Sequence, residues 1–320
     1  MQRRIAAAAA LLIAGLSSVA SAQDWPQRPV TVVVPFAAGG NTDSIGRMAA
    51  QALSESFGKS FVVENRPGAG GAIAADAVAK AQPDGYTLLI AALPVMAVVP
   101  AINKVKFDSQ KDFAPISNIA TNPFVIVVNK NIPVQSLAEF VAYAKARQGQ
   151  LSYGSAGVGS LNHLSMALFL KRAGLEMTHV PYKGNAPALG DVVAGHIPAM
   201  FSNLSDALPQ AAAGNVKMIA VSSDKRSPAA PEVPTVIESG YPDFNVLTWN
   251  GIMAPAGTPP EIVKKIAAVI EKAVKDPKFA KQLTEMGADP LGSTPEEYKA
   301  MLARDIATWK EAVEIAGVKQ

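Results

Sequence analysis

Short apolar runs alternate with segments of helical periodicity over the first third of the chain. Runs rich in β-branched residues occupy 30–34, 61–64 and 87–90, and helix-period segments lie between them at 43–57 and 71–81. The apolar residues of the first helical segment share one face; they are Ile45, Met48, Ala49, Ala52, Leu53 and Phe57. Because short strands separated by amphipathic helices are typical of parallel βαβ units, the pattern predicts an α/β fold.

The same alternation resumes after Asn122 and Pro123. The expected strands and helices lie at 124–128, 136–147, 151–153, 160–172 and 177–180. Residues 241–254 then have the pattern of an extended segment, and three helical segments follow with almost no strands between them. Helices without strands of their own must pack on an existing sheet, so we expect the chain to leave a first lobe near Asn122 and to return near Phe244.

These breaks predict how the chain is divided. Residues 23–122 and 245–320 form a discontinuous first lobe, residues 123–244 form a second lobe, and a ligand cleft lies between them. Setting aside the first 22 of the 320 residues leaves 298, a length that favours about two domains. Each lobe is expected to hold a mostly parallel sheet flanked by helices.

The N-terminal 22 residues have the pattern of a cleavable secretory signal. Arg3 and Arg4 give a basic start, an apolar stretch follows, and residues 20–22 (Ala-Ser-Ala) form a small-residue cleavage site. A membrane-spanning helix needs about 18 or more consecutive apolar residues, and this stretch is shorter. We therefore expect export, a mature chain that begins near Gln23, and no membrane-spanning segment.

The amino-acid composition excludes or disfavours several classes of function. Cysteine is absent, which excludes disulfides, thiolate metal sites and cysteine nucleophiles. Loss of Arg3 and Arg4 lowers the formal net charge from +3 to +1. A near-neutral protein has no general attraction to nucleic acid or to anionic membranes, so a polyanion-binding role is disfavoured.

The segment 32–43 joins a buried-type strand to a helix through a glycine loop. Its sequence is Val-Val-Val-Pro-Phe-Ala-Ala-Gly-Gly-Asn-Thr-Asp. Glycine lets the backbone approach a ligand closely, and the first helical turn offers unpaired N–H groups and the positive end of the helix dipole. The segment predicts an anion site; a plain strand-to-helix turn with Asp43 as the N-terminal cap is the alternative.

A second segment repeats this arrangement in the predicted second lobe. The strand 151–153 runs into the loop 154–160 (Gly-Ser-Ala-Gly-Val-Gly-Ser), and a helix follows with Asn162 and His163 near its start. Two such loops facing each other would hold a carboxylate between two helix N-termini. Each charge-assisted bond is worth about 1.5 to 3 kcal/mol, so a few approach the roughly 8 kcal/mol of micromolar binding. For His163, a capping or packing role is the alternative to ligand contact.

Other classes of site fit the sequence less well. The loop 68–71 also follows a strand and precedes a helix, but no loop has the full G-x-G-x-x-G spacing followed by the acidic residue of a dinucleotide site. Residues 222–225 match S-x-x-K without its companion motifs, and no G-x-S-x-G occurs. The three histidines lack the spacing of a metal site. The sequence therefore predicts no catalytic residues, no metal and no cofactor.

Eight short motifs occur in order along the mature chain. They are W-P with R-P-V at 25–30, V-P-F-A-A-G-G with T-D at 34–43, V-E-N-R-P-G-A-G-G at 63–71, P-D-G-Y-T-L at 83–88, K-D-F-A-P at 111–115, Y-G-S-A-G at 153–157, H-V-P-Y-K-G at 179–184 and A-P-A-G-T-P at 254–259. In these motifs the chain resembles the substrate-binding receptors of tripartite tricarboxylate transporters, the TctC or Bug family. The resemblance covers essentially the whole mature chain.

This resemblance implies a type II periplasmic-binding-protein fold, in which two lobes close on a ligand like a hinged trap. It implies a monomeric periplasmic receptor without catalytic activity, which binds a small di- or tricarboxylate or an aromatic acid and delivers it to membrane transporter subunits. Presentation of the ligand to a signalling partner is the alternative role. A secreted hydrolase is a further alternative that no residue set supports.

The ligand loops of the family correspond to 36–43 and 155–160, the two loops that the helix-terminus argument also favours. Tyr182 and Lys183 are added by position, with a plain turn at Lys183-Gly184 as the alternative. Arg66 is expected to be structural, as a buried partner of Glu64 or of a loop carbonyl. The expected ligand-binding residues are Phe36, Ala38, Gly39, Gly40, Thr42, Asp43, Ala92, Ser155, Gly157, Gly159, Ser160, His163, Tyr182, Lys183 and Ser202.

Two departures from the family pattern bear on the ligand. Many relatives have polar residues after the third strand, where this chain has Ala-Ala-Leu-Pro-Val-Met at 91–96, so an apolar wall is implied. Many also carry an acidic residue at the position of Ser202, where it would meet a ligand ammonium group. We therefore expect a carboxylate without an amine and with an aromatic or otherwise apolar body, rather than a highly polar tricarboxylate.

Overall fold

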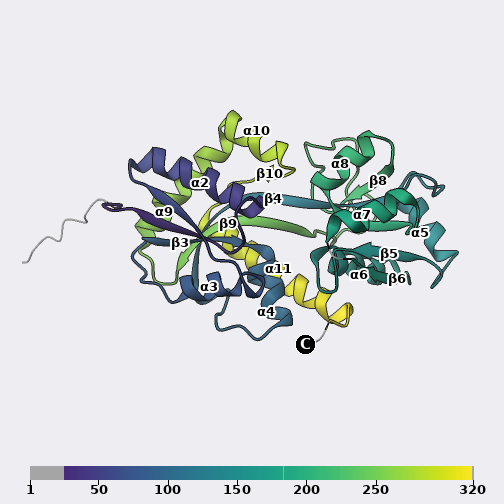
Figure 1. Ribbon diagram of the computed structural model, residues 1–320, viewed down its shortest axis with the longest axis horizontal. Helices are drawn as coiled ribbons and strands as arrows, with labels where there is room; N and C mark the ends of the chain where they lie inside the picture. The colour runs from purple at the N-terminus through teal and green to yellow at the C-terminus, as the bar shows by residue number, and fades with distance from the viewer. Residues whose placement is uncertain (1–24, 183, 319–320) are drawn as a thin grey trace, which may run out of the picture.

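Two lobes lie side by side and are joined by long strands that run between them (Figure 1). The computed structural model describes residues 25–182 and 184–318. The predicted signal, residues 1–22, and Lys183 lie outside the described residues.

The first lobe is built mainly from the two ends of the described chain. Its N-terminal elements are β1 (Val30–Val34), α2 (Asn41–Phe57), β2 (Phe61–Asn65), the short 3-10 turn η1 (Ala69–Gly71), α3 (Ala72–Ala79), β3 (Thr87–Ala92), the π-helical turn η2 (Pro94–Val98) and α4 (Val99–Ile102). Its C-terminal elements are β9 (Leu247–Pro255), α9 (Pro260–Lys275), α10 (Pro277–Glu285), β10 (Asp289–Pro290) and α11 (Pro295–Ile315). The strands and helices expected here are present, although the extended segment expected at 241–254 becomes a strand only at Leu247.

The second lobe is entered through β4 (Phe113–Asn129), a strand that both lobes share. Its other elements are α5 (Leu137–Lys145), β5 (Ser152–Ser155), α6 (Leu161–Ala173), β6 (Thr178–Pro181), α7 (Asn185–Ala194), β7 (Ala199–Asn203), α8 (Leu204–Ala212) and β8 (Val216–Val221). The last four had not been assigned from the sequence. Pro187 and Gly190 interrupt the helical pattern of α7, and Pro209 interrupts that of α8.

The sheet runs through both lobes in the order β2-β1-β3-β9-β4-β7-β5-β6, with β8 and β10 also paired to β4. Strands β1, β2 and β3 are parallel in one lobe, and β5, β6 and β7 are parallel in the other. The expectation of mostly parallel sheets is corrected at the centre, where β4 pairs antiparallel with β7, β8 and β9. Antiparallel pairing lets two long strands carry the chain out of one lobe and back into it.

The partners of β4 change between Pro123 and Phe124. Up to Pro123, which lies opposite Leu247, the strand pairs with β9; from Phe124, which lies opposite Asn203, it pairs with β7. We propose that the boundary between the lobes lies here, with the division near Asn122 and Phe244 that the sequence predicts.

Alternate residues of β1 pack into two different cores. Val32 and Val34 lie in one core with Ile45 of α2 and Ile266 of α9, whereas Val33 points into the core on the opposite face. All of these side chains are fully buried, and burying one contributes about 1.5 to 3 kcal/mol. This two-sided burial explains why β1 is a continuous apolar run, and it fixes the strand end from which the first glycine loop departs.

The C-terminal helix α11 bridges the lobes. It begins at a capping box made by Thr294 and Glu297, packs on η2 in the first lobe, and reaches α6 in the second (Figure 1). Inside the first lobe, Trp249 of β9 donates its indole N–H to Asp305 Oδ2 at 2.8 Å. The helix is therefore bonded within the first lobe and contacts the second lobe at α6.

Candidate functional site

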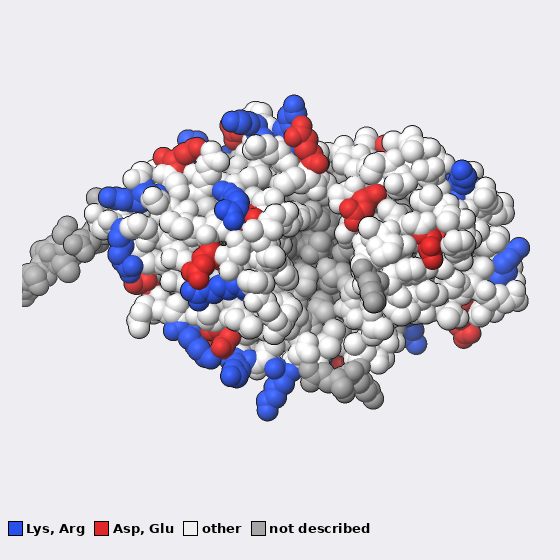
Figure 2. All heavy atoms as spheres, in the orientation of Figure 1, with Lys and Arg blue, Asp and Glu red and all other residues white. Residues whose placement is uncertain are grey.

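Both lobes turn the carboxyl ends of their parallel strands toward the space between them. The loop after β5 reaches the first lobe, because a Cβ built on Gly159 would lie 3.2 Å from Cδ1 of Ile102 in α4, which follows β3. Figure 2 shows the surface hollowed between the lobes. In open α/β sheets, ligands bind outside the carboxyl ends of the strands, so this cleft is the candidate site.

Helix α2 starts at the cleft and packs tightly on the sheet. A Cβ built on Gly46 would lie 3.0 Å from Ile90 Cγ1 and 3.1 Å from Val34 Cγ2. Because glycine stands there, the helix approaches β1 and β3 closely. Its first turn is thereby held beside the ends of these strands.

Asp43, in the first turn of α2, holds the first glycine loop. Its Oδ2 accepts the Gly39 N–H and the Arg47 Nε–H, both at 2.9 Å, and its Oδ1 accepts from Asn65 Nδ2 at 2.9 Å. Asn65 Nδ2 also donates to the Phe36 carbonyl at 2.9 Å. Burial acts to raise the pKa of Asp43, but these hydrogen bonds outweigh burial and lower the pKa to about 2. The Asp43 carboxylate thus fixes the conformation of the loop through Gly39 and Asn65.

Among the described residues, no side chain caps the start of α2. The N-cap residue, Gly40, has no side chain to cap the helix, and the first four N–H groups of a helix have no acceptor within it. Thr42 lies in this turn, and its Oγ1 accepts a hydrogen bond from Asn250 Nδ2 of β9 at 2.9 Å. The turn therefore presents backbone N–H groups and one hydroxyl at the cleft, an arrangement that attracts an anion.

The residues of the second glycine loop form hydrogen bonds with one another. Ser155 is fully buried; its Oγ accepts the Gly157 N–H at 3.1 Å and lies 2.6 Å from His179 Nε2. Ser160 caps α6 by accepting the His163 N–H at 3.3 Å, and its hydroxyl donates to the Gly157 carbonyl at 2.7 Å. Several donors of this loop are thus already used.

His163 completes this second loop from inside the lobe. Its Nδ1 accepts the Gly159 N–H at 3.1 Å, and its ring stacks on His179 with centroids 3.8 Å apart. Burial, with a smaller contribution from His179, lowers the pKa of His163 to about 4, and burial also lowers the pKa of His179. His163 is buried and holds the loop through its bond to the Gly159 N–H.

An amide network lies at the carboxyl end of β7. Asn185 Nδ2 donates to Ser202 Oγ at 3.2 Å and to Asp206 Oδ2 at 2.6 Å, and Asn162 Nδ2 donates to Asn185 Oδ1 at 3.1 Å. Ser202, expected from the sequence, lies in this network. The three others and Asn250 had not been expected. Asn162, Asn185 and Asp206 lie in the first turns of α6, α7 and α8, and that position was the available signal; Asn250 lies inside β9.

Comparison with known proteins bears on this arrangement. The model of the TctC family, described as the tripartite tricarboxylate transporter family receptor, matches residues 45–318. The protein BugT of Bordetella pertussis is 35% identical over 308 residues, which cover 96% of this chain and 94% of BugT. The chain belongs to the TctC receptor family.

Two solved structures of related receptors share the fold. An R. palustris protein solved with adipate is 39% identical, with a TM-score of 0.74, and the match covers 92% of this chain and 99% of that chain. A TctC solute-binding protein from Polaromonas solved without ligand is 32% identical, with a TM-score of 0.84, and the match covers 91% and 99%. The fold is thus the two-lobed fold of periplasmic binding proteins.

The TctC receptors and these structural relatives are solute-binding proteins and not enzymes, and the family is periplasmic. Within residues 25–182 and 184–318, no helix has the length and apolar character needed to cross a membrane. The same part of the chain holds no group of three His, Asp or Glu side chains placed to bind a metal ion.

In this TctC receptor, the Tyr182 side chain is bonded to α7 through its hydroxyl. That hydroxyl donates to Asp191 Oδ2 of α7 at 2.5 Å. Burial first, and then the contact with Asp191, raises the pKa of Tyr182 to about 12. The Tyr182 ring lies beside Gly154, so it packs against the start of the second loop.

The segment after β3 is apolar and buried. Ala92 ends β3 opposite Asn250 of β9, and Leu93, Val95 and Met96 of the following turn are fully buried.

The expectation that Arg66 is a buried partner of Glu64 or of a loop carbonyl is wrong in one respect. Arg66 forms an ion pair with Glu64 at 2.6 Å, but both side chains are more than 40% exposed. The pair lies on the surface rather than in the core.

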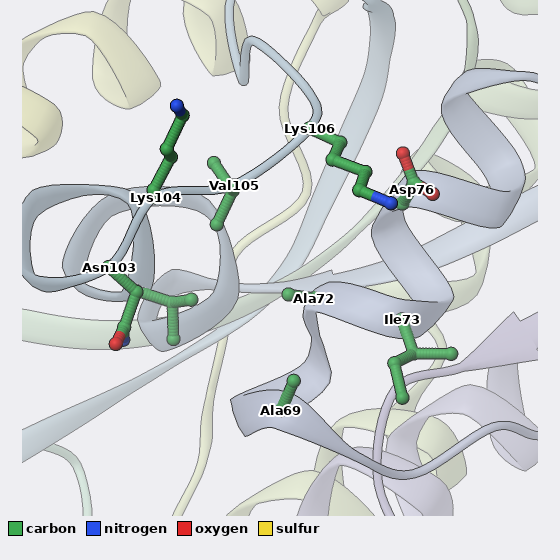
Figure 3. Close-up of a pocket in the computed structure, with 9 residues that line it drawn as sticks. Ala69, Ala72, Ile73, Asp76, Asn103, Lys104, Val105 and Lys106 are labelled. Carbon is green, nitrogen blue, oxygen red and sulfur yellow. The ribbon is translucent and has the colours of Figure 1, made fainter.

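A hollow of about 430 Å³ lies on another part of the first lobe, between η1, α3, α4 and the residues that follow α4 (Figure 3). Its wall includes Ile73, Val99 and Lys106, and Figure 3 shows Lys106 reaching toward Asp76. None of the expected ligand-binding residues lines it, so it is separate from the cleft.

Proposed function

We propose that this TctC receptor binds a small organic carboxylate in the interlobe cleft, outside the cytoplasm, and delivers it to the membrane subunits of a tripartite transporter. The observation that carries the proposal is the first turn of α2. There, open backbone N–H groups and the Thr42 hydroxyl lie in a loop that Asp43 holds in shape. The adipate found with the R. palustris relative supports a carboxylate as the ligand.

The expected site residues divide into two proposed roles. Phe36, Ala38, Gly40 and Thr42 would face the ligand from the first lobe, together with Gly39 at the turn. In the second lobe, the backbone of the loop from Ser155 to Ser160 would approach from the opposite side. Asp43 and His163 would hold the two loops in place, because the structure shows them bonded to loop backbone.

The apolar residues around Ala92 support a refinement of the ligand class. Ala92 stands at the end of β3, and the apolar residues Leu93 and Met96 behind it are buried in the core. We therefore propose a carboxylate with an aliphatic or aromatic body, rather than a ligand with a polar group at every carbon. Apolar contact stabilises such a body by about 25 cal/mol per Å² removed from water.

A melting-temperature screen tests this function. The chain without residues 1–22 is heated with adipate, succinate, citrate, benzoate or glutamate, and titration calorimetry follows any shift. A ligand at 100 times its dissociation constant adds about 2.7 kcal/mol of stability, which is several degrees. We expect adipate or benzoate to give the largest rise.

Two outcomes of this screen would count against the proposal. A larger rise with citrate or glutamate would overturn the apolar refinement only. If no carboxylate raises the melting temperature and mass spectrometry of the denatured protein finds no ligand retained from its preparation, the carboxylate-receptor function itself is wrong.

A further inference from the structure

Asn250 places a buried amide against the first ligand loop. The residue is 4% exposed, it lies opposite Ala92 in the pairing of β3 with β9, and its Nδ2 donates to Thr42 Oγ1 at 2.9 Å. The next residue, Gly251, faces the other side of the sheet, where a Cβ would collide with Tyr298 of α11. The amide thus projects toward α2.

The hydrogens of this pair can be counted. Asn250 carries two N–H hydrogens and Thr42 carries one O–H hydrogen. When Asn250 donates to Thr42 Oγ1, the Thr42 hydroxyl keeps its own hydrogen for another acceptor. If the amide is turned by 180°, Thr42 donates to Asn250 Oδ1 and the amide keeps both N–H hydrogens. In either orientation the pair has a donor left over.

We propose that Asn250 is a positioning residue, which directs the Thr42 hydroxyl as a donor to the ligand and so favours a carboxylate over a neutral amide. The inference rests on the proposed function and adds a determinant of its specificity. A hydrogen bond to a charged oxygen is about twice as strong as one to a neutral oxygen, so an oriented donor discriminates between the two. The Thr42 hydroxyl contacts the ligand, and Asn250 acts through it.

The variants Asn250→Asp and Thr42→Val test this arrangement most directly. Aspartate has the shape of asparagine but only accepts, so it would take the hydroxyl hydrogen of Thr42 and present lone pairs to the ligand. The probes are adipate and its neutral counterpart adipamide, and benzoate with benzamide, measured by calorimetry at pH 7.5. We expect Thr42→Val to weaken binding of the preferred carboxylate about tenfold, and Thr42→Ser to change it less than about threefold.

Asn250→Ala should weaken carboxylate binding by a similar factor, and the double variant with Thr42→Val should lose no more than either single variant. Asn250→Asp should lower the ratio of carboxylate to amide affinity at least about tenfold. Asn118→Ala, which removes another buried asparagine of the first lobe, is the control; it should lower the melting temperature without changing that ratio.

The outcomes separate this inference from the proposed function. If the unaltered protein binds a carboxylate but Asn250→Ala and Asn250→Asp keep its affinity and its preference, the positioning role is wrong. Additive losses in the double variant would also overturn it, because Asn250 would then act independently of Thr42. If the unaltered protein binds neither carboxylate nor any other acid of the screen, the proposed function fails and the inference fails with it.

Discussion

The two glycine loops make the same backbone contact with different side chains. In the first lobe a carboxylate oxygen of Asp43 accepts the Gly39 N–H, and in the second lobe the Nδ1 atom of His163 accepts the Gly159 N–H. Each side chain belongs to the third residue of its helix and reaches back four positions. The first acceptor is ionised, whereas the second must stay neutral to accept.

The loops also differ in what remains at the helix start. Ser160 caps α6, while Gly40 has no side chain with which to cap α2. The first loop is therefore held by Asp43, and no side chain caps the helix that follows it. The second loop instead forms hydrogen bonds among its own residues and caps its helix with Ser160. A glycine loop between strand and helix thus indicates where an anion could bind, but the side chains around it determine whether the N–H groups are available.

Removal of Asp43 is expected to have the largest effect. In Asp43→Ala, the donors of Gly39, Arg47 and Asn65 lose their acceptor, and the free energy of unfolding should fall by about 3 kcal/mol. Carboxylate affinity should fall by about 100-fold or more, because the open loop loses its shape. Urea unfolding and calorimetry measure the two effects.

Glu55→Ala is the matched control for this variant, since Glu55 lies on the exposed face of the same helix and bonds only Gln51 among the contacts of its side chain that the structure shows. It should change stability by less than about 0.5 kcal/mol. An Asp43→Ala variant that keeps its carboxylate affinity would show that the first loop does not depend on this carboxylate.

The glycines of the two loops give the next largest effect. Gly157 has a φ of 128° and a Cβ there would lie 3.3 Å from the Tyr182 carbonyl oxygen, whereas Gly39 has a φ of 88° with nothing within 4 Å. An alanine at positive φ costs about 1 to 2 kcal/mol. Gly157→Ala should therefore destabilise the protein by about 2 kcal/mol and Gly39→Ala by about 1. The reverse order in thermal unfolding would mean that the second loop is the more adaptable of the two.

Acid should distinguish the loops next. The pKa of His163 is about 4 in the folded protein, against 6.5 for the free side chain. Below pH 6.5, His163 therefore takes up a proton in the unfolded chain but stays neutral in the folded protein. The free energy of unfolding falls as the pH drops toward 4, by up to about 1.4 kcal/mol per pH unit. The pKa of Asp43 is about 2, so the first loop keeps its carboxylate ionised throughout this range.

The variant His163→Gln sharpens this test, because glutamine accepts a hydrogen bond but does not titrate. Unfolding free energies of both proteins are measured between pH 7.5 and 4, together with the affinity for one carboxylate at each pH. The ligand titrates equally in both series, so it cancels from the comparison. Parallel pH profiles for the two proteins would exclude His163 as the acid-sensitive support of the second loop.

The strand, glycine loop and helix at the start of the first lobe could be predicted from the sequence because the residues that form them are neighbours in the chain. The apolar run of β1, the glycines and Asp43 are neighbours in the chain, and the helix that follows has a clear apolar face. The back-bond of Asp43 resembles the capping role considered from the sequence, since the carboxylate accepts an N–H just before the helix. The predicted sheet and its two lobes likewise followed from strand and helix periodicity.

The contacts that could not be predicted from the sequence join residues that lie far apart in the chain. The partner of Thr42 is Asn250, 208 positions away, and only the pairing of β3 with β9 brings it there. His179 reaches Ser155 across two parallel strands, and α11 reaches the second lobe although it belongs to the first. Strand β7 lies in a segment whose flanking helices contain proline, so local propensity gave no pattern to identify it.

Two adjacent residues provide the smallest and last test. Asn65 ends β2 and Arg66 follows it. The Asn65 side chain bonds Asp43 and the Phe36 carbonyl, whereas the Arg66 side chain pairs only with Glu64 among the contacts that the structure shows. Exposed ion pairs contribute about 0 to 1 kcal/mol, so Arg66→Ala should shift the melting temperature little and leave carboxylate affinity unchanged.

Asn65→Ala should instead cost about 1 to 2 kcal/mol and weaken binding, because it frees the carboxylate that holds the first loop. Thermal unfolding and calorimetry on the two variants give the comparison directly. If Arg66→Ala lowers affinity as much as Asn65→Ala does, the surface beside β2 takes part in ligand capture, and the first loop is not set by Asp43 and its partners alone.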